Sequence, residues 1–282
     1  MSRISETFAH LKSAGKRGLI PFITAGDPDL ETTRNLLLAL ARAGSDVIEL
    51  GVPFSDPIAD GPVIQRASER ALRRQISVAE ILEVLKGARR EMDVPVVIFS
   101  YLNPLLQFGV TRFAAEAARA GVDAVLLTDL PLEEAGEFTK ELSANALDLI
   151  LLVAPTSTDE RLRIIAEKAS GFIYAVSRTG VTGATTELSN EAEKLVKRVR
   201  AVSDLPVAVG FGISNAEQVA DVWRYADAAV VGSAIVAEIE RNGRVERTAG
   251  RGDLIQVVEE FVRALKPTQS NTKSEPGAVA TA

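Results

Sequence analysis

The sequence predicts an α/β protein that folds as a single (β/α)8 barrel, also called a TIM barrel. Eight short apolar segments alternate with helical segments along the chain, which is the pattern of parallel strands joined by crossover helices. Eight such units within about 250 residues match the length of a closed barrel. The alternative is a doubly wound open sheet, but no GxGxxG motif follows the first predicted strand to indicate a dinucleotide site.

The order of the elements follows from apolar spacing and from the residues that begin or end helices. An extra amphipathic helix at about 2–14 carries Ile4, Phe8 and Leu11 on one face. The strands are expected at 19–24, 47–51, 94–100, 124–128, 148–154, 172–177, 206–210 and 228–231. The helices between and after them are expected at 30–43, 77–91, 111–120, 133–143, 158–168, 189–202, 214–224 and 253–265.

Short extra helices are expected in the loops after the second and eighth strands, at 62–74 and 233–241. The residues expected to begin helices include Ser77, Thr111 and Ser214, and those expected to end them include Gly44 and Gly121. Residues 103–108 form an unusually apolar stretch after the third strand, and we expect a loop there. The barrel is expected to occupy 1–266, and the tail at 267–282 lacks apolar periodicity and is expected to be disordered.

Composition excludes several classes of function. The 282 residues are 46% hydrophobic and carry a net charge of −6, which argues against a nucleic-acid or anionic-membrane surface. The absence of cysteine excludes disulfides, thiolate metal sites and cysteine nucleophiles. There is no apolar run of about 20 residues and no signal-peptide pattern, so the expected location is the cytoplasm.

The side chains that remain for chemistry are carboxylates. The single histidine, His10, lies in the predicted N-terminal helix, where a surface or packing role is expected. No lysine lies at the end of a predicted strand, which disfavours a Schiff base. In a barrel of this kind, function lies at the carboxyl ends of the strands. The acids expected at that end are Asp27, Glu49, Asp56, Asp60 and Asp129.

Glu49 is the hardest of these acids to explain as structural. Asp27 and Asp56 precede prolines and suit turns, while Asp60 and Asp129 suit loops held by backbone N–H groups. Glu49 instead lies inside a strand, where alternation puts it on the same face as Val47 and Gly51. Apolar walls raise the pKa of a carboxyl group, which suits a residue that donates and accepts protons. A structural Glu–Arg pair is the alternative.

Glycines predict a phosphate site at the same end of the barrel. Gly183 ends the loop after the sixth strand, Gly212 follows the seventh, and Gly232 and Ser233 open a helix after the eighth. Barrels often bind phosphate through these loops and a short helix N-terminus. Residues 178–184 contain two glycines and are a candidate lid over substrate. The apolar stretch 103–108 either covers substrate, binds a partner or packs against a helix.

Six motifs resemble the alpha subunit of tryptophan synthase, and the resemblance covers residues 1–266. The most specific motif is IELGVPFSDPIADGP at 48–62. The other five motifs are PFITAGDP, SYLNPLLQFG, SRTGVTG, GFGIS and VGSAIV, and all six occur in the order of the family pattern. Thr128 departs from the pattern, which has Ala or Pro there, so no substrate role is carried onto it.

The resemblance implies cleavage of indole-3-glycerol phosphate to indole and D-glyceraldehyde 3-phosphate by a retro-aldol reaction. Glu49 and Asp60 would be the catalytic pair. Asp60 would hold the indole N–H and stabilise positive charge, while Glu49 would protonate the indole carbon at the scissile bond and take the proton from the glycerol hydroxyl. The implied phosphate contacts are Gly183, Gly212, Gly232 and Ser233. The implied indole contacts are Phe22, Tyr174 and Phe211, with Thr182 in the closing loop near Asp60.

The resemblance also implies a partner. The beta subunit would carry pyridoxal phosphate, condense indole with serine and contact Asp56, Asn103 and Phe108 in an alpha2–beta2 complex. This chain would need no cofactor or metal of its own. Two alternatives stay open: a stand-alone lyase for the same substrate, and a non-catalytic regulatory barrel. An unrelated phosphate-binding barrel isomerase is disfavoured by the motif at 48–62.

Overall fold

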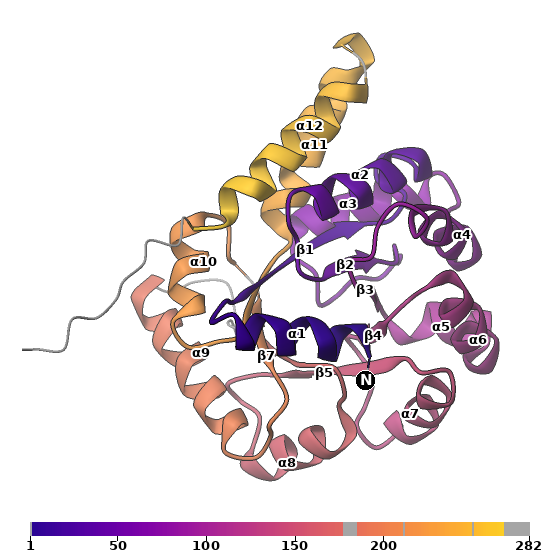
Figure 1. Cartoon of the computed structure of the whole chain (residues 1–282). Helices are drawn as coiled ribbons and strands as arrows, with labels where there is room; N and C mark the ends of the chain where they lie inside the picture. Colours follow the sequence, from indigo (N-terminus) through magenta and orange to yellow (C-terminus); the bar gives the residue numbers. More distant parts are fainter. Residues whose placement is uncertain (1, 177–184, 211, 250, 268–282) are drawn as a thin grey trace, which may run out of the picture.

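The computed structural model describes residues 2–176, 185–210, 212–249 and 251–267, and it shows a closed parallel barrel surrounded by helices (Figure 1). The strands are β1 (Gly18–Thr24), β2 (Ile48–Gly51), β3 (Val96–Ser100), β4 (Ala124–Leu127), β5 (Asp148–Val153), β6 (Ile173–Val176), β7 (Val207–Gly210) and β8 (Ala228–Val231). Each pairs in parallel with the next, and β8 pairs with β1. The predicted barrel is confirmed, and the open-sheet alternative is wrong.

Helices follow the strands around the outside of the barrel. They are α1 (Arg3–Ser13), α2 (Leu30–Arg42), α3 (Pro62–Leu72), α4 (Val78–Ala88), α5 (Leu102–Phe108), α6 (Val110–Ala120), α7 (Ala135–Ala144), α8 (Asp159–Lys168), α9 (Thr185–Arg200), α10 (Ala216–Trp223), α11 (Ser233–Ala249) and α12 (Arg251–Leu265). The expected extra helices after the second and eighth strands are α3 and α11, and α11 continues beyond its expected end to Ala249.

The segment after β3 differs most from the expectation, because 103–108 is helical rather than a loop. Pro104 is tolerated because first-turn N–H groups have no acceptor within the helix. The Leu102 N–H at the start of α5 donates to Asp129 Oδ1 at 2.7 Å, so a residue from the next loop caps this helix. Gly109, with a φ of 90°, separates α5 from α6. It is the residue that begins α6, where the sequence predicts Thr111.

A second helix start also differs by one residue. Asn215, rather than Ser214, caps α10, because its Oδ1 accepts the Gln218 N–H at 2.9 Å. Ser77 caps α4 as expected, with a reciprocal bond from its backbone N–H to Glu80. Gly121 ends α6 in the left-handed conformation, as expected for a helix-stopping glycine. Asx and Ser residues both cap helices well, which is why adjacent candidates are hard to separate from sequence.

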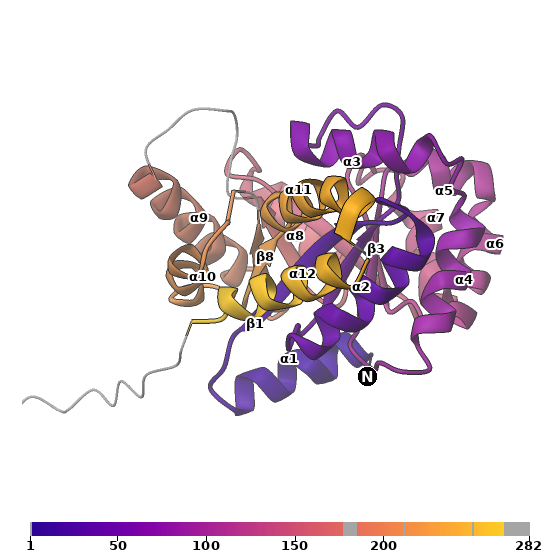
Figure 2. The same cartoon turned by 90° about the horizontal axis from the view of Figure 1, so that it is seen from above.

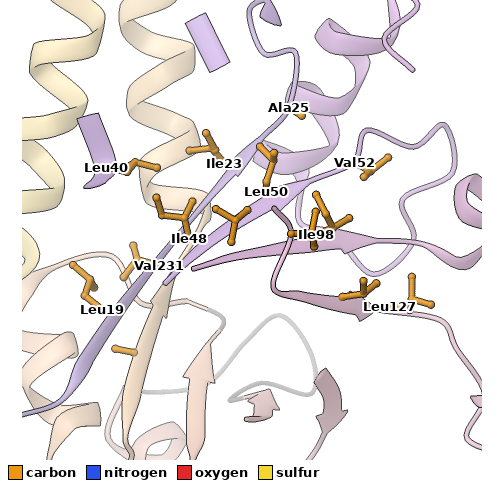
Figure 3. Close-up of a cluster of buried hydrophobic side chains, with 14 of the residues drawn as sticks. Leu19, Ile23, Ala25, Leu40, Ile48, Leu50, Val52, Ile98, Leu127 and Val231 are labelled. Atoms are coloured by element: carbon orange, nitrogen blue, oxygen red, sulfur yellow. The ribbon is translucent and has the colours of Figure 1, made fainter. Parts of the chain in front are cut away.

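Apolar side chains form two cores that the alternation of each strand keeps apart. One core fills the barrel and includes Val47 and Tyr174. The other lies between the strands and the helices, and Figure 3 shows part of it, including Ile48 and Leu50 of β2 and Leu40 of α2. The expected faces of β2 are therefore confirmed. Full burial of such side chains stabilises the fold by about 1.5–3 kcal/mol each.

Helix α1 covers the amino-terminal ends of the strands, opposite α3 (Figure 2). Its Phe8 ring packs against Phe172 inside the barrel, with centroids 5.6 Å apart. Asp123 binds Arg3 and Arg89, each at 2.6 Å, and accepts the Val96 N–H at 2.8 Å. Because this end is closed by packing and ion pairs, the site must be sought at the other end.

The first and last strands meet at a seam between β1 and β8, where Gly18 pairs with Ala228 and Pro21 with Val231. Helix α12 packs against α2 and α11 across this seam (Figures 1 and 2). Arg42 binds Glu259 at 2.8 Å, and Lys266 binds Asp46 at 3.1 Å. Contacts between the last helix and the first helix after β1 therefore cover the seam and hold the barrel closed.

Candidate active site

Glu49 faces the inside of the barrel as a buried carboxyl group. The side chain is 1% exposed, and its Oε1 has no hydrogen-bond partner within the described part of the chain. Burial raises the pKa of Glu49 to about 8, as the strand pattern predicted. Among the described residues no cation pairs with Glu49, so this part of the chain does not support the structural Glu–Arg pair. At neutral pH this carboxyl group is mostly protonated and can both give and take a proton.

Asp60 lies in the loop after β2, directly before the start of α3. Its N–H donates to the Pro57 carbonyl at 3.0 Å, and its own carbonyl accepts Gln65 Nε2 at 2.9 Å. Gly61 and Pro62 then begin the helix, and proline suits that first position. Burial raises the pKa of Asp60 to about 6, while a hydrogen bond from Tyr101 acts in the opposite direction.

Tyr101 connects the loops after β2 and β3 and was not predicted as a site residue. Its hydroxyl accepts the Ala59 N–H at 2.9 Å and donates to the Asp60 carboxylate. Its ring stacks on Phe54, with centroids 4.9 Å apart. The only sequence signal was an aromatic residue directly after a strand, at the end of the barrel where function is expected.

Two glycines make room for the aromatic rings beside the carboxylates. A Cβ on Gly51 would lie 2.5 Å from Phe22 Cζ, and one on Gly210 would lie 2.0 Å from Tyr174 Oη. Burial, and then the charges of Glu49 and Asp60, raise the pKa of Tyr174 well above its usual value. Tyr174 is therefore near both carboxylates, and the expected ring contacts Phe22 and Tyr174 belong to the same region.

The expected phosphate residues are placed only in part. Gly232 and Ser233 lie at the start of α11, whose first N–H groups have no acceptor within the helix. A Cβ on Gly232 would be 3.5 Å from Phe22 Cβ, so this helix start adjoins the ring region. Gly212 follows β7 with a φ of 86°. Thr182, Gly183, Phe211 and the candidate lid 178–184 lie outside the described residues.

Asp27 lies in the turn after β1, as Pro28 suggested, since its N–H donates to the Thr24 carbonyl at 3.4 Å, but its side chain has a further role. The side chain is buried and binds Arg70 of α3 through two bonds, to Nε at 2.7 Å and to Nη2 at 2.8 Å. Arg70 also binds Glu240 of α11 at 3.0 Å. Burial outweighs Arg70 and raises the pKa of Asp27 above its ordinary value. Nothing in the sequence linked these three residues.

The expected partner contacts have mixed exposure. Asp56 and Asn103 are exposed, and Ile58 beside Asp56 is 88% exposed. The Phe108 ring is half-buried, packs edge-on against Phe113 and lies under the Arg112 guanidinium at 4.4 Å. A groove of about 420 Å³ lies between the loop after β2 and α5.

The remaining residues singled out in the sequence are Asp129, Thr128 and His10. Asp129 caps α5, as expected for a loop acid. Thr128 Oγ1 lies 3.5 Å from the Ser100 carbonyl, and His10 is exposed on α1. Within the described ranges, no cluster of three or more His, Cys, Asp or Glu side chains could hold a metal ion. No helix in these ranges has the length and hydrophobicity to span a membrane.

Comparison with known proteins agrees with this arrangement. A family model described as tryptophan synthase alpha chain matches residues 8–266. The tryptophan synthase alpha chain of Citrifermentans bemidjiense is 49% identical over 94% of this chain and 97% of its own length. That of Neisseria gonorrhoeae is 48% identical over 93% of this chain and its whole length.

Solved structures show the same likeness. The tryptophan synthase alpha chain from Legionella pneumophila superposes with a TM-score of 0.86 at 37% identity, covering 98% of this chain and all of its own. A chain from the tryptophan synthase a2b2 complex of Pyrococcus furiosus has a TM-score of 0.80 at 40% identity, covering 88% and 97%. The relatives are subunits of an enzyme, and the chain belongs to the tryptophan synthase alpha chain family.

Proposed function

We propose that this chain is a carbon–carbon lyase that cleaves indole-3-glycerol phosphate to indole and D-glyceraldehyde 3-phosphate. The observation that carries the proposal is a buried Glu49 with a pKa raised to about 8 in the same barrel mouth as Asp60, whose pKa is raised to about 6. Between these values one carboxyl group is protonated and the other is ionised. Environments that push two pKa values apart assign an acid and a base.

Glu49 carries the proton in this mechanism. Protonated Glu49 transfers its proton to the indole carbon that bears the glycerol chain, which leaves a positively charged ring. The resulting carboxylate then takes the proton of the adjacent glycerol hydroxyl. The bond between ring and side chain breaks, its electrons restore the aromatic ring, and the hydroxyl carbon becomes the aldehyde. Because the indole itself accepts the electrons, proton transfers suffice and no cofactor is needed in this chain.

Asp60 stabilises the charge that this proton transfer creates. Its carboxylate would accept the indole N–H and lie close to the positive ring, where a fixed negative charge has most effect in a buried site. Tyr101 supports this role, because its hydrogen bond favours the ionised form of Asp60. Phe22, Tyr174 and Phe211 would enclose the ring, and Thr182 would approach Asp60 from the closing loop.

The phosphate is assigned to the other side of the ring pocket. Gly183, Gly212, Gly232 and Ser233 would supply backbone N–H groups, and the positive end of α11 would attract the anion. The proximity of Gly232 to Phe22 supports a substrate whose ring and phosphate are a short chain apart. No lysine or arginine is required when the amides and the helix start bind the anion.

We further propose a beta subunit as partner, as in the Pyrococcus furiosus a2b2 complex. The exposed side chains of Asp56 and Ile58 and the groove beside α5 support a docking face that includes Asn103. Phe108 would contribute through its packed ring rather than as a free side chain. Pyridoxal phosphate would belong to that partner.

The experiment that tests the function is indole release from indole-3-glycerol phosphate, with and without a beta subunit. We expect release by the wild-type chain that increases with the partner. High activity that the partner does not change would favour the stand-alone lyase. Binding of the substrate without turnover, even with the partner, would favour the regulatory barrel and overturn the proposal.

A further inference from the structure

Arg70 lies where three elements of the proposed active site meet. The loop after β1 follows the strand that carries Phe22, α3 begins two residues after Asp60, and α11 begins at Ser233. Helices α3 and α11 pack against each other and against β1. The Arg70 side chain belongs to α3 and binds the other two elements, so it fixes the relative positions of all three.

The contacts of Arg70 use the shape of the guanidinium group. Nε and Nη2 bind both oxygens of Asp27, at 2.7 and 2.8 Å, and Nη1 binds Glu240 Oε1 at 3.0 Å. The Asp27 side chain is 2% exposed and that of Glu240 is 11% exposed. A lysine has a single charged nitrogen and cannot reproduce this planar fork.

Stability alone is a weak reason for this network. Burial outweighs the attraction of Arg70 and raises the pKa of Asp27, so the buried carboxylate is not fully compensated. Replacement of buried ion pairs by apolar residues is often neutral or stabilising, and their better attested use is to specify one arrangement. The arrangement specified here is the position of α3, which directly follows the Asp60 loop, relative to α11, whose start is the proposed phosphate site.

Periodicity places the contacts on the faces that this role requires. Glu240 follows Ser233 by seven residues, which is about two turns of α11. Arg66 and Arg70 are four residues apart and both bind Glu240 from α3. Arg66 lies at the exposed side and does not bind Asp27, so it offers a matched comparison.

We propose that Arg70 is a positioning residue that couples phosphate binding at α11 to the placement of Asp60, through Glu240 and Asp27. The inference rests on the proposed lyase function and deepens it. Phosphate bound at the start of α11 fixes that helix, and Arg70 transmits its position to α3 and the loop that carries Asp60. The phosphate group of the substrate then contributes to turnover and not only to affinity.

The test separates the phosphate from the reacting part of the substrate. Indole release is measured with indole-3-glycerol, which lacks the phosphate, in the presence and absence of phosphite dianion. In the wild type we expect phosphite to accelerate cleavage. The ratio of the two rates should fall at least about tenfold in Arg70→Lys, since misplacement of about 1 Å can cost 10²-fold in rate. Arg66→Lys is the matched control and should keep the wild-type ratio.

Glu240→Met provides a second variant, because it leaves the Asp27–Arg70 pair intact and avoids an unpaired buried carboxylate. We expect the same loss of phosphite acceleration. A merely structural role would lower both rates equally and leave the ratio unchanged, which would overturn the inference. An unaccelerated wild type that cleaves the full substrate would also overturn it. Failure of the wild type to release indole from indole-3-glycerol phosphate would instead overturn the proposed function, and this inference with it.

Discussion

Replacement of Glu49 by Gln should stabilise the fold while it abolishes the proposed reaction. Burial raises the pKa of Glu49 from 4.5 to about 8. The folded protein therefore holds this proton more tightly than the unfolded chain, and the free energy of unfolding falls as pH rises between these two values. Because the unfolded chain ionises Glu49 freely and the folded protein does not, the raised pKa lowers the free energy of unfolding by about 3 kcal/mol at pH 7 and about 5 kcal/mol above pH 8. A glutamine does not ionise and avoids this cost.

Denaturant titrations of both proteins at about pH 5, 7 and 9 measure the effect as the difference in free energy of unfolding. We expect the two proteins to differ by about 1 kcal/mol or less at pH 5 and the variant to gain several kcal/mol by pH 9. Glu83→Gln, at an exposed position paired with Lys86, is the control and should show no such gain. Indole release by Glu49→Gln should fall at least about 100-fold.

Two results would refute this reasoning. A stability difference that stays constant across the pH range would show that Glu49 ionises as easily in the folded protein as in the unfolded chain. Wild-type turnover by a folded Glu49→Gln variant would exclude Glu49 as the proton carrier. The first result concerns the buried environment and the second concerns the chemistry, so each can fail alone.

Three further predictions concern the groups around Glu49. The value of kcat/KM should fall below about pH 6 as Asp60 gains a proton (the acid limb of the pH profile) and above about pH 8 as Glu49 loses one. Asp60→Asn should remove the acid limb and lower kcat/KM about 100-fold, whereas an unchanged acid limb would assign it to another group. Tyr101→Phe removes the hydrogen bond that lowers the pKa of Asp60, so the acid limb should move to higher pH, which the same profile measures; a limb that stays in place contradicts the contact. Gly51→Ala places a Cβ 2.5 Å from Phe22 Cζ, so it should destabilise the fold by about 1–3 kcal/mol and raise KM. The control Gly136→Ala, where nothing lies within 4 Å, should do neither, and equal melting temperatures of Gly51→Ala and the wild type would show that the Phe22 ring moves without cost.

The barrel could be predicted because its signals are local. Alternation within β2 separates Glu49 from Ile48 and Leu50, and the two cores confirm that separation. A strand needs only its own period to reveal its faces. Motif resemblance supplied the role of Asp60, which no spacing in the loop could indicate.

The features that sequence reasoning missed depend on residues far apart in the chain. Helix α5 is capped by Asp129, 27 residues beyond Leu102. Arg70 reaches Asp27 across 43 residues and Glu240 across 170. The role of Tyr101 requires that two loops come together. Such contacts arise from the closed barrel itself, so they become visible only when the strands are in register.

The seam between β1 and β8 has a consequence for biosynthesis. One edge of β1, from Gly18 to Pro21, acquires its partner only when 228–231 has been made, more than 200 residues later. An unpaired strand edge is a template for wrong pairing, and domains synthesised from the amino terminus expose such edges until they close. The helices that cover the seam, α11 and α12, follow β8 in the chain and are made after it. A chain whose synthesis stops before β8 therefore holds a β1 edge without its partner, and that edge is a site for wrong pairing.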